Sequence, residues 1–181
     1  IESGNDFIRN KVMKRNISRK VMFNSFELAN KYKLRTCSPC VIGVPFETPE
    51  MIEDSIKTVS QLNITEKGVN IFFPYRGTPL RTVCEENNML PDLKKIVVKE
   101  RKESILNLPT IKKSEIQYYH DNWERLLLKK MGARSYFGSI CKDTYLALTD
   151  NSVGRKAKYI VYHNKHTRKV KEGCKKALGI S

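Results

Sequence analysis

Residues 40–50 read Cys-Val-Ile-Gly-Val-Pro-Phe-Glu-Thr-Pro-Glu, and this stretch decides how the rest of the chain is interpreted. Its first five residues are apolar apart from one glycine and show no polar alternation, which is typical of a strand buried on both faces in a parallel sheet. Thr48 can cap a following helix that has Pro49 at its first position. In such strand–helix units the loop after the strand lies at the ligand-binding edge, so we expect Gly43 and Glu47 there.

The strand-then-helix pattern recurs on both sides of this stretch. Apolar runs, caps and helical periodicity predict strands at residues 1–3, 34–44 and 68–74, and helices at residues 5–13, 18–32, 48–62 and 78–88. Every connection between strands is long enough for a crossover helix, which favours parallel strands in a barrel or an open sheet. Residues 1–90 therefore form one α/β unit in this interpretation.

The second half of the chain has a different composition. Residues 92–181 hold 21 Lys and Arg against 9 Asp and Glu, whereas residues 1–91 hold 13 against 10. Helices are predicted at 114–130, 135–148 and 152–178. Residues 91–181 are thus expected to be a Lys-rich helical extension, either a solvated surface or a partner surface for RNA or an anionic surface.

Cysteine usage and hydropathy limit the remaining classes. Five cysteines, an odd number, argue against a disulfide framework, and Cys37 and Cys40 would point to opposite faces of one strand. No apolar run approaches 18 residues and no signal-peptide pattern is present, so we expect a cytoplasmic protein without a transmembrane segment. Because the sequence opens at Ile1 on what reads as a strand end, we expect the natural protein to extend upstream.

Three stretches together resemble one enzyme family. Residues 2–5, 43–48 and 73–80 read Glu-Ser-Gly-Asn, Gly-Val-Pro-Phe-Glu-Thr and Phe-Pro-Tyr-Arg-Gly-Thr-Pro-Leu. They are similar to the ends of strands four, five and six of the radical S-adenosylmethionine (SAM) enzymes, most closely the branch with an amino-terminal cobalamin-binding domain. The resemblance covers about half of the chain. It implies an α/β fold that is the carboxyl-terminal half of a partial (β/α)6 TIM-like barrel, followed by the basic helical extension.

The resemblance also implies an activity for the intact parent. A 4Fe–4S cluster in such enzymes reductively cleaves SAM to a 5′-deoxyadenosyl radical for methyl transfer or other carbon-centred chemistry, here with cobalamin. The cluster-binding CxxxCxxC motif is absent from this chain, so the chain alone is expected to be inactive. The implied partners are the missing amino-terminal half of the barrel, an organic substrate of unknown identity, and an electron donor such as flavodoxin or ferredoxin.

Cofactor-binding roles follow from the resemblance for Glu2, Ser3, Arg15, Gly43, Phe73 and Tyr75. Glu2 would accept hydrogen bonds from the ribose hydroxyls, and Arg15 would hold the SAM carboxylate, a role for which Lys14 competes. The alternative for Glu2 is a carboxylate that faces solvent or caps the next helix, and the alternative for Arg15 is a cation at the end of a helix. Ser3 alternates to the other face of its strand, where a structural role is the competing interpretation.

The remaining candidates lie at the ends of the other two strands. Gly43 would let adenine lie against the backbone, or would permit close packing of a strand on a helix. Phe73 and Tyr75 would offer main-chain groups to the adenine edge, or would only pack. Glu47 is expected to stabilise its own loop and the start of the next helix. The competing function for the whole chain is a basic α/β binding module for RNA or an anionic surface, without catalysis.

Overall fold

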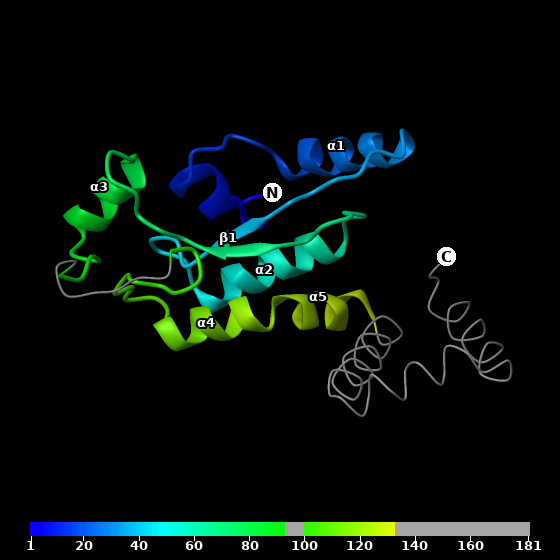
Figure 1. Ribbon diagram of the computed structural model, residues 1–181. Helices are drawn as coiled ribbons and strands as arrows, with labels where there is room; N and C mark the ends of the chain where they lie inside the picture. The colour runs from blue at the N-terminus through cyan, green and yellow to red at the C-terminus, as the bar shows by residue number, and fades with distance from the viewer. Residues whose placement is uncertain (93–99, 133–181) are drawn as a thin grey trace, which may run out of the picture. The chain divides into compact units, whose positions relative to one another are not determined.

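The computed structural model describes residues 1–92 and 100–132 (Figure 1). Its elements in chain order are a π-helix η1 (Ile8–Val12), α1 (Arg19–Lys31), β1 (Cys40–Ile42), α2 (Pro49–Ser60), β2 (Val69–Ile71), α3 (Pro79–Glu86), α4 (Lys113–Asp121) and α5 (Trp123–Met131). The predicted mixture of helices and parallel strands is confirmed, and the described residues form no closed barrel. The helices predicted at 135–148 and 152–178 lie outside the described residues.

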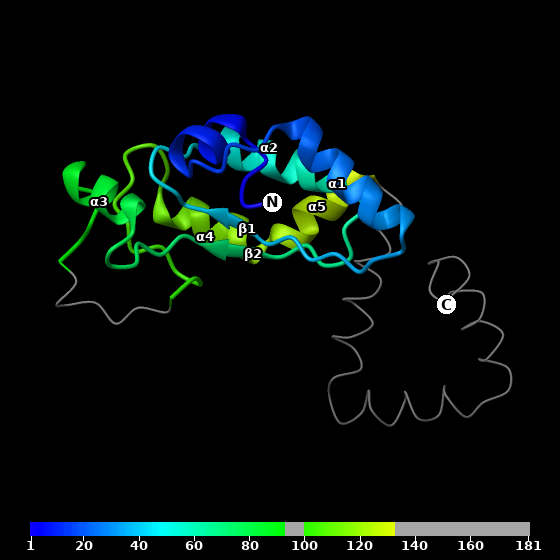
Figure 2. The ribbon, with the colours of Figure 1, turned by 90° about the horizontal axis from the view of Figure 1, so that it is seen from above.

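The sheet consists of β1 and β2, which run parallel with Cys40 opposite Val69 and Ile42 opposite Ile71. Both strands are shorter than the sequence predicts, and Gly43 explains one end because its φ of +75° leaves the extended region. The amino-terminal segment is not a strand, but it lies beside β1, since the Val41 amide donates to the Glu2 carbonyl at 2.8 Å. In both views the amino terminus lies beside β1 (Figures 1 and 2).

The far edge of β2 is also covered. The Ile71 amide donates to the carbonyl of Arg101 at 2.9 Å, so a later segment lies along the strand that would otherwise be an open edge. The spatial order is therefore residues 1–3, β1, β2 and residue 101, which is also the order along the chain.

Helix starts follow the predicted local signals. Thr48 and Thr78 occupy the N-cap positions of α2 and α3, with Pro49 and Pro79 first in each helix. Neither threonine hydroxyl bonds an amide of its own helix, and Thr78 Oγ1 instead donates to the Tyr75 carbonyl at 2.8 Å. Proline at the first position thus marks these starts, because its missing N–H would be unpaired there in any case.

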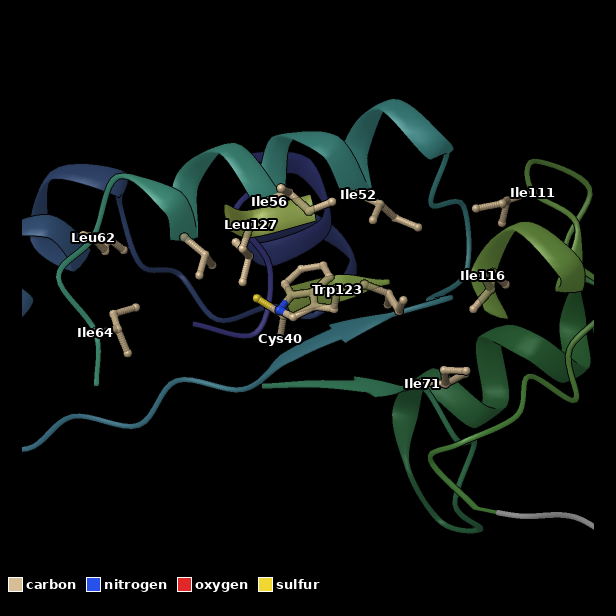
Figure 3. Packing of buried hydrophobic residues seen from close by; sticks show 12 residues of the cluster. Cys40, Ile52, Ile56, Leu62, Ile64, Ile71, Ile111, Ile116, Trp123 and Leu127 are labelled. Atoms are coloured by element: carbon tan, nitrogen blue, oxygen red, sulfur yellow. The ribbon is translucent and has the colours of Figure 1, made fainter. Parts of the chain in front are cut away.

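The main core lies between the sheet and the helices α2, α4 and α5 (Figure 3). Figure 3 shows Trp123 and Leu127 of α5 between α2 and the strand that carries Cys40. The buried cluster comprises Cys40, Ile42, Ile52, Ile56, Val59, Leu62, Ile64, Ile71, Ile111, Ile116, Trp123 and Leu127. The predicted inward stripe of α2 is confirmed by Ile52, Ile56 and Val59.

The helices after residue 110 belong to this same core. The first compact unit runs over Ile1–Met131, so it extends past the division drawn from composition at residues 90 and 91. The single helix predicted at 114–130 is two helices, α4 and α5, and the break falls at Asn122. The Asn122 side-chain amide donates to the carbonyl of Tyr118 at 2.9 Å, which closes α4 locally. No helix of the described residues is both long and apolar enough to span a membrane.

Candidate functional site

The candidate site lies at the carboxyl end of the parallel segments. Because residues 1–3, β1 and β2 lie side by side and β1 is parallel to β2, the loops that follow β1 and β2 leave the sheet at the same edge. These loops carry Gly43 and Glu47 after β1 and Phe73 and Tyr75 after β2. The structure therefore brings Gly43, Phe73 and Tyr75 to one edge of the sheet, and it places Glu2 beside Val41 of β1.

Glu2 and Arg15 form an ion pair with two hydrogen bonds. Arg15 Nη2 donates to Glu2 Oε1 at 2.7 Å, and Arg15 Nε donates to Glu2 Oε2. The two side chains remain 37% and 53% exposed, respectively, so both still face solvent. Lys14 and Asn16, on either side of Arg15, adopt φ values of 54° and 51°, a left-handed conformation that asparagine tolerates and lysine rarely adopts.

Ser3 has a structural position. Its side chain is fully buried, its hydroxyl lies 3.2 Å from Ser55 Oγ, and it accepts a hydrogen bond from the Asn5 amide at 3.2 Å. The Gly4 amide also donates to Ser55 Oγ, at 2.9 Å. A Cβ on Gly4 would lie 2.6 Å from the Cα of Ser55, so the segment after Glu2 sits directly on helix α2. Ser3 therefore fixes the segment and has no surface open to a ligand.

Gly43 is required for two local reasons. Its φ of +75° favours glycine, and a Cβ there would lie 3.2 Å from both Cδ1 and Cγ2 of Ile116. The sequence left two roles open for Gly43, contact with adenine and close packing of a strand on a helix. The geometry matches close packing, and the helix that packs on Gly43 is α4. The sequence alone could not identify that neighbour, because Ile116 is 73 residues further along the chain.

Glu47 is the buried ionisable residue of this edge. Its side chain is fully buried, and Oε2 accepts hydrogen bonds from the amides of Gly43 at 2.6 Å and Val44 at 3.3 Å. Oε1 has no hydrogen-bond partner. Burial raises the pKa of the Glu47 carboxyl from 4.5 to about 8, although the two amide hydrogen bonds oppose the shift. Glu47 therefore holds its own loop, as predicted, and does so as a protonated acid at neutral pH.

The aromatic residues after β2 make local contacts. The Phe73 and Tyr75 rings pack edge to face with centroids 4.8 Å apart. The Tyr75 hydroxyl donates to Glu100 Oε2 at 3.0 Å and accepts from Arg101 Nε at 3.2 Å. The Tyr75 amide donates to the Phe73 carbonyl at 3.0 Å, and the Tyr75 carbonyl accepts from Thr78. The main-chain groups of Tyr75 that were expected to meet adenine are thus occupied within the turn.

Two residues, Glu2 and Arg15, could hold parts of a ligand. The half-exposed Glu2 carboxylate can accept further hydrogen bonds from hydroxyls, and the half-exposed Arg15 guanidinium retains donors for an anion. In the described part of the chain, no group of three or more His, Cys, Asp or Glu side chains could hold a metal ion. The arrangement suits a polar ligand that carries both hydroxyls and a carboxylate.

The sequence was also compared with family models and with curated proteins. No family model matches it, and no curated protein matches it.

Proposed function

We propose that this chain is the carboxyl-terminal half of a radical SAM enzyme barrel, in which Glu2 and Arg15 bind the ribose and the carboxylate of SAM. The observation that carries the proposal is the Glu2–Arg15 pair, in which Glu2 lies beside β1 of the parallel sheet. A carboxylate suits a vicinal diol, and a guanidinium suits a carboxylate. The cobalamin-dependent branch is proposed on the sequence resemblance alone.

The order of the strands and the placement of the crossover helices are compatible with half of a barrel. Residues 1–3, β1 and β2 are neighbours in chain order. Helix α2 packs on the main core cluster, and Phe23 and Phe26 of α1 pack against the same cluster. Both crossover helices therefore cover one face, as in a barrel; one half of a doubly wound sheet has the same arrangement, so the barrel itself is proposed on the sequence resemblance.

The paired state of Glu2 and Arg15 is compatible with ligand binding. A carboxylate has about four acceptor sites and a guanidinium five donors, so two mutual hydrogen bonds leave capacity on each partner. When bound next to a reduced cluster held elsewhere in the parent, SAM would supply the radical chemistry. The residues of this chain would bind and orient it, and Glu47 would keep the loop after β1 in place.

The test uses two ligands that differ in one group. SAM has an amino-acid carboxylate, whereas methylthioadenosine has the ribose and adenine but no carboxylate. Each is titrated into the ¹⁵N-labelled chain, and amide shifts of residues 2–4 and 43–47 are followed. Arg15→Gln should weaken SAM binding about tenfold or more and leave methylthioadenosine unchanged, whereas Glu2→Gln should weaken both.

Arg35→Gln is the matched control, because Arg35 forms an exposed ion pair with Glu66 away from this edge. It should change neither affinity. The proposal is wrong if neither ligand shifts these amides at millimolar concentration, or if Arg35→Gln weakens SAM binding as much as Arg15→Gln does. Nucleic-acid binding that falls steeply with salt, without any response to SAM, would favour the basic binding module instead.

The coding sequence upstream of Ile1 gives an independent test. A reading frame that contains CxxxCxxC would support the radical SAM parent, and a further cobalamin-binding domain would support that branch. A complete upstream frame without the three cysteines would contradict the proposal.

A further inference from the structure

Arg9 is a buried cation inside the first loop. Its side chain is 2% exposed, and no other Lys or Arg of the described residues is buried. Every nitrogen of the guanidinium donates a hydrogen bond: Nη1 donates to the carbonyls of Ser3 at 3.0 Å and Gly4 at 3.2 Å, and Nε donates to the carbonyl of Ile17 at 2.9 Å. Nη2 donates to the carboxylate of Asp6, which is its counter-ion. Burying a cation is costly, and these hydrogen bonds offset that cost.

The groups that Arg9 binds belong to two separate segments of the candidate site. Ser3 and Gly4 directly follow Glu2, and Ile17 lies two residues after Arg15. The main chain of Arg9 adds a further link, because the Arg15 amide donates to the Arg9 carbonyl at 3.0 Å. One residue thus connects the segment that carries the carboxylate to the loop that carries its guanidinium partner.

We propose that Arg9 is a positioning residue that fixes Glu2 and Arg15 as a pair for an adenosyl amino acid, without touching the ligand. This inference rests on the proposed function for the identity of the ligand. The planar fork of arginine reaches three carbonyls and a carboxylate at once, whereas a lysine ammonium is a compact group with three donors. Shape as well as charge is therefore needed at position 9.

Arg19 provides a matched control. Its Nη2 also donates to the Gly4 carbonyl, at 3.0 Å, but Arg19 has no hydrogen bond to residues 14–17 among those described. Arg9→Lys and Arg19→Lys both keep the charge and both remove a guanidinium from the same carbonyl. Only Arg9→Lys removes the link to the loop that carries Arg15.

The first readout needs no ligand. The Nε–Hε resonance of Arg15 in a ¹⁵N spectrum reports its hydrogen bond to Glu2. Arg9→Lys should shift this resonance toward that of a solvated arginine and speed its exchange with water, and Arg19→Lys should leave it unchanged. An unaltered Arg15 resonance in folded Arg9→Lys overturns the inference. Folding is checked by the fluorescence of Trp123, which is the only tryptophan and is 3% exposed.

The second readout is SAM affinity in two backgrounds. Arg9→Lys should weaken SAM binding about tenfold in the wild-type background and less than about twofold when Arg15 is already Gln, because without the Arg15 guanidinium there is no pair left to fix. Equal losses in both backgrounds would mean a general structural role and would overturn the inference. If wild-type protein does not bind SAM, the proposed function fails, while the Arg15 resonance still decides whether Arg9 positions the pair.

A measurement on the wild-type chain covers the case in which Arg9→Lys does not fold. The Arg15 amide and the Arg9 Nε–H should exchange with water through one shared opening, because both bonds belong to the same linkage. Free exchange of the Arg15 amide while Arg9 stays protected would overturn the inference.

Discussion

Glu47 gives a prediction whose sign and size follow from its burial. The pKa of this carboxyl is about 8 in the folded chain against an ordinary value of 4.5, because the group is removed from water and Oε1 lacks a partner. Between these two pH values the unfolded chain has lost the proton while the folded chain keeps it. Stability therefore falls as pH rises, by about 1.4 kcal/mol for each pH unit.

From pH 5 to pH 8 the loss attributable to Glu47 is roughly 4 kcal/mol, a large part of the 5–15 kcal/mol that is usual for a folded domain. Glu47→Gln should abolish this loss. The side-chain oxygen of the glutamine can accept the same hydrogen bonds from the amides of Gly43 and Val44. Its NH2 group takes the place of the hydroxyl of the protonated acid, and neither group has a hydrogen-bond partner there. We therefore expect similar stability for the two proteins near pH 5 and a more stable variant at pH 8.

The assay is urea unfolding at pH 5, 6, 7 and 8, followed by the fluorescence of buried Trp123. All other ionisable groups are common to both proteins, so their contributions cancel in the difference between the two curves. A wild-type stability that stays level or rises over this range, with Glu47→Gln parallel to it, would refute the burial argument.

Two further predictions use pairs of matched substitutions. Gly43→Ala should cost about 3 kcal/mol, because it combines a left-handed φ with a Cβ 3.2 Å from Ile116, whereas Gly77→Ala, at φ +78° in open space, should cost about 1 kcal/mol. If urea unfolding shows the same loss of stability for both variants, the contact with Ile116 does not contribute to the cost of Gly43→Ala. Ile56→Ala should cost about 3 kcal/mol because Ile56 is fully buried, while Leu28→Ala, at 57% exposure, should change stability by less than about 0.5 kcal/mol. A large loss for Leu28→Ala would indicate that a partner covers that face of α1 in solution.

The parts of the fold that sequence predicted depend on local patterns. The unalternated apolar run before Gly43 indicated a parallel strand, and the Thr-Pro pairs at Thr48 and Thr78 located two helix starts, because these signals act within a few residues. The lengths of the strands were overestimated, since the hydrogen bonds between strands stop where the backbone leaves the extended region. The SAM-binding roles assigned to Phe73 and Tyr75 remain predictions.

What the sequence could not predict depends on contacts between distant residues. The residues that follow position 110 read as an extension by their charge, yet Ile116 and Trp123 are buried against the first half of the chain. From the sequence, Arg9 is indistinguishable from the many surface cations, because the residues next to it in the chain do not indicate that three backbone carbonyls are its partners. The Glu2–Arg15 pair joins two residues whose roles were assigned separately.

The placement of α4 and α5 in the main core has a consequence for synthesis of the chain. A ribosome releases β1, α2 and β2 well before α5, and until then nothing supplies Trp123 and Leu127 to the core around Cys40. The nascent chain thus passes through a stage with an exposed apolar surface, of the kind that chaperones bind. A protein shortened at residue 90 would remain at that stage, so its production should depend on chaperones where the longer chain does not.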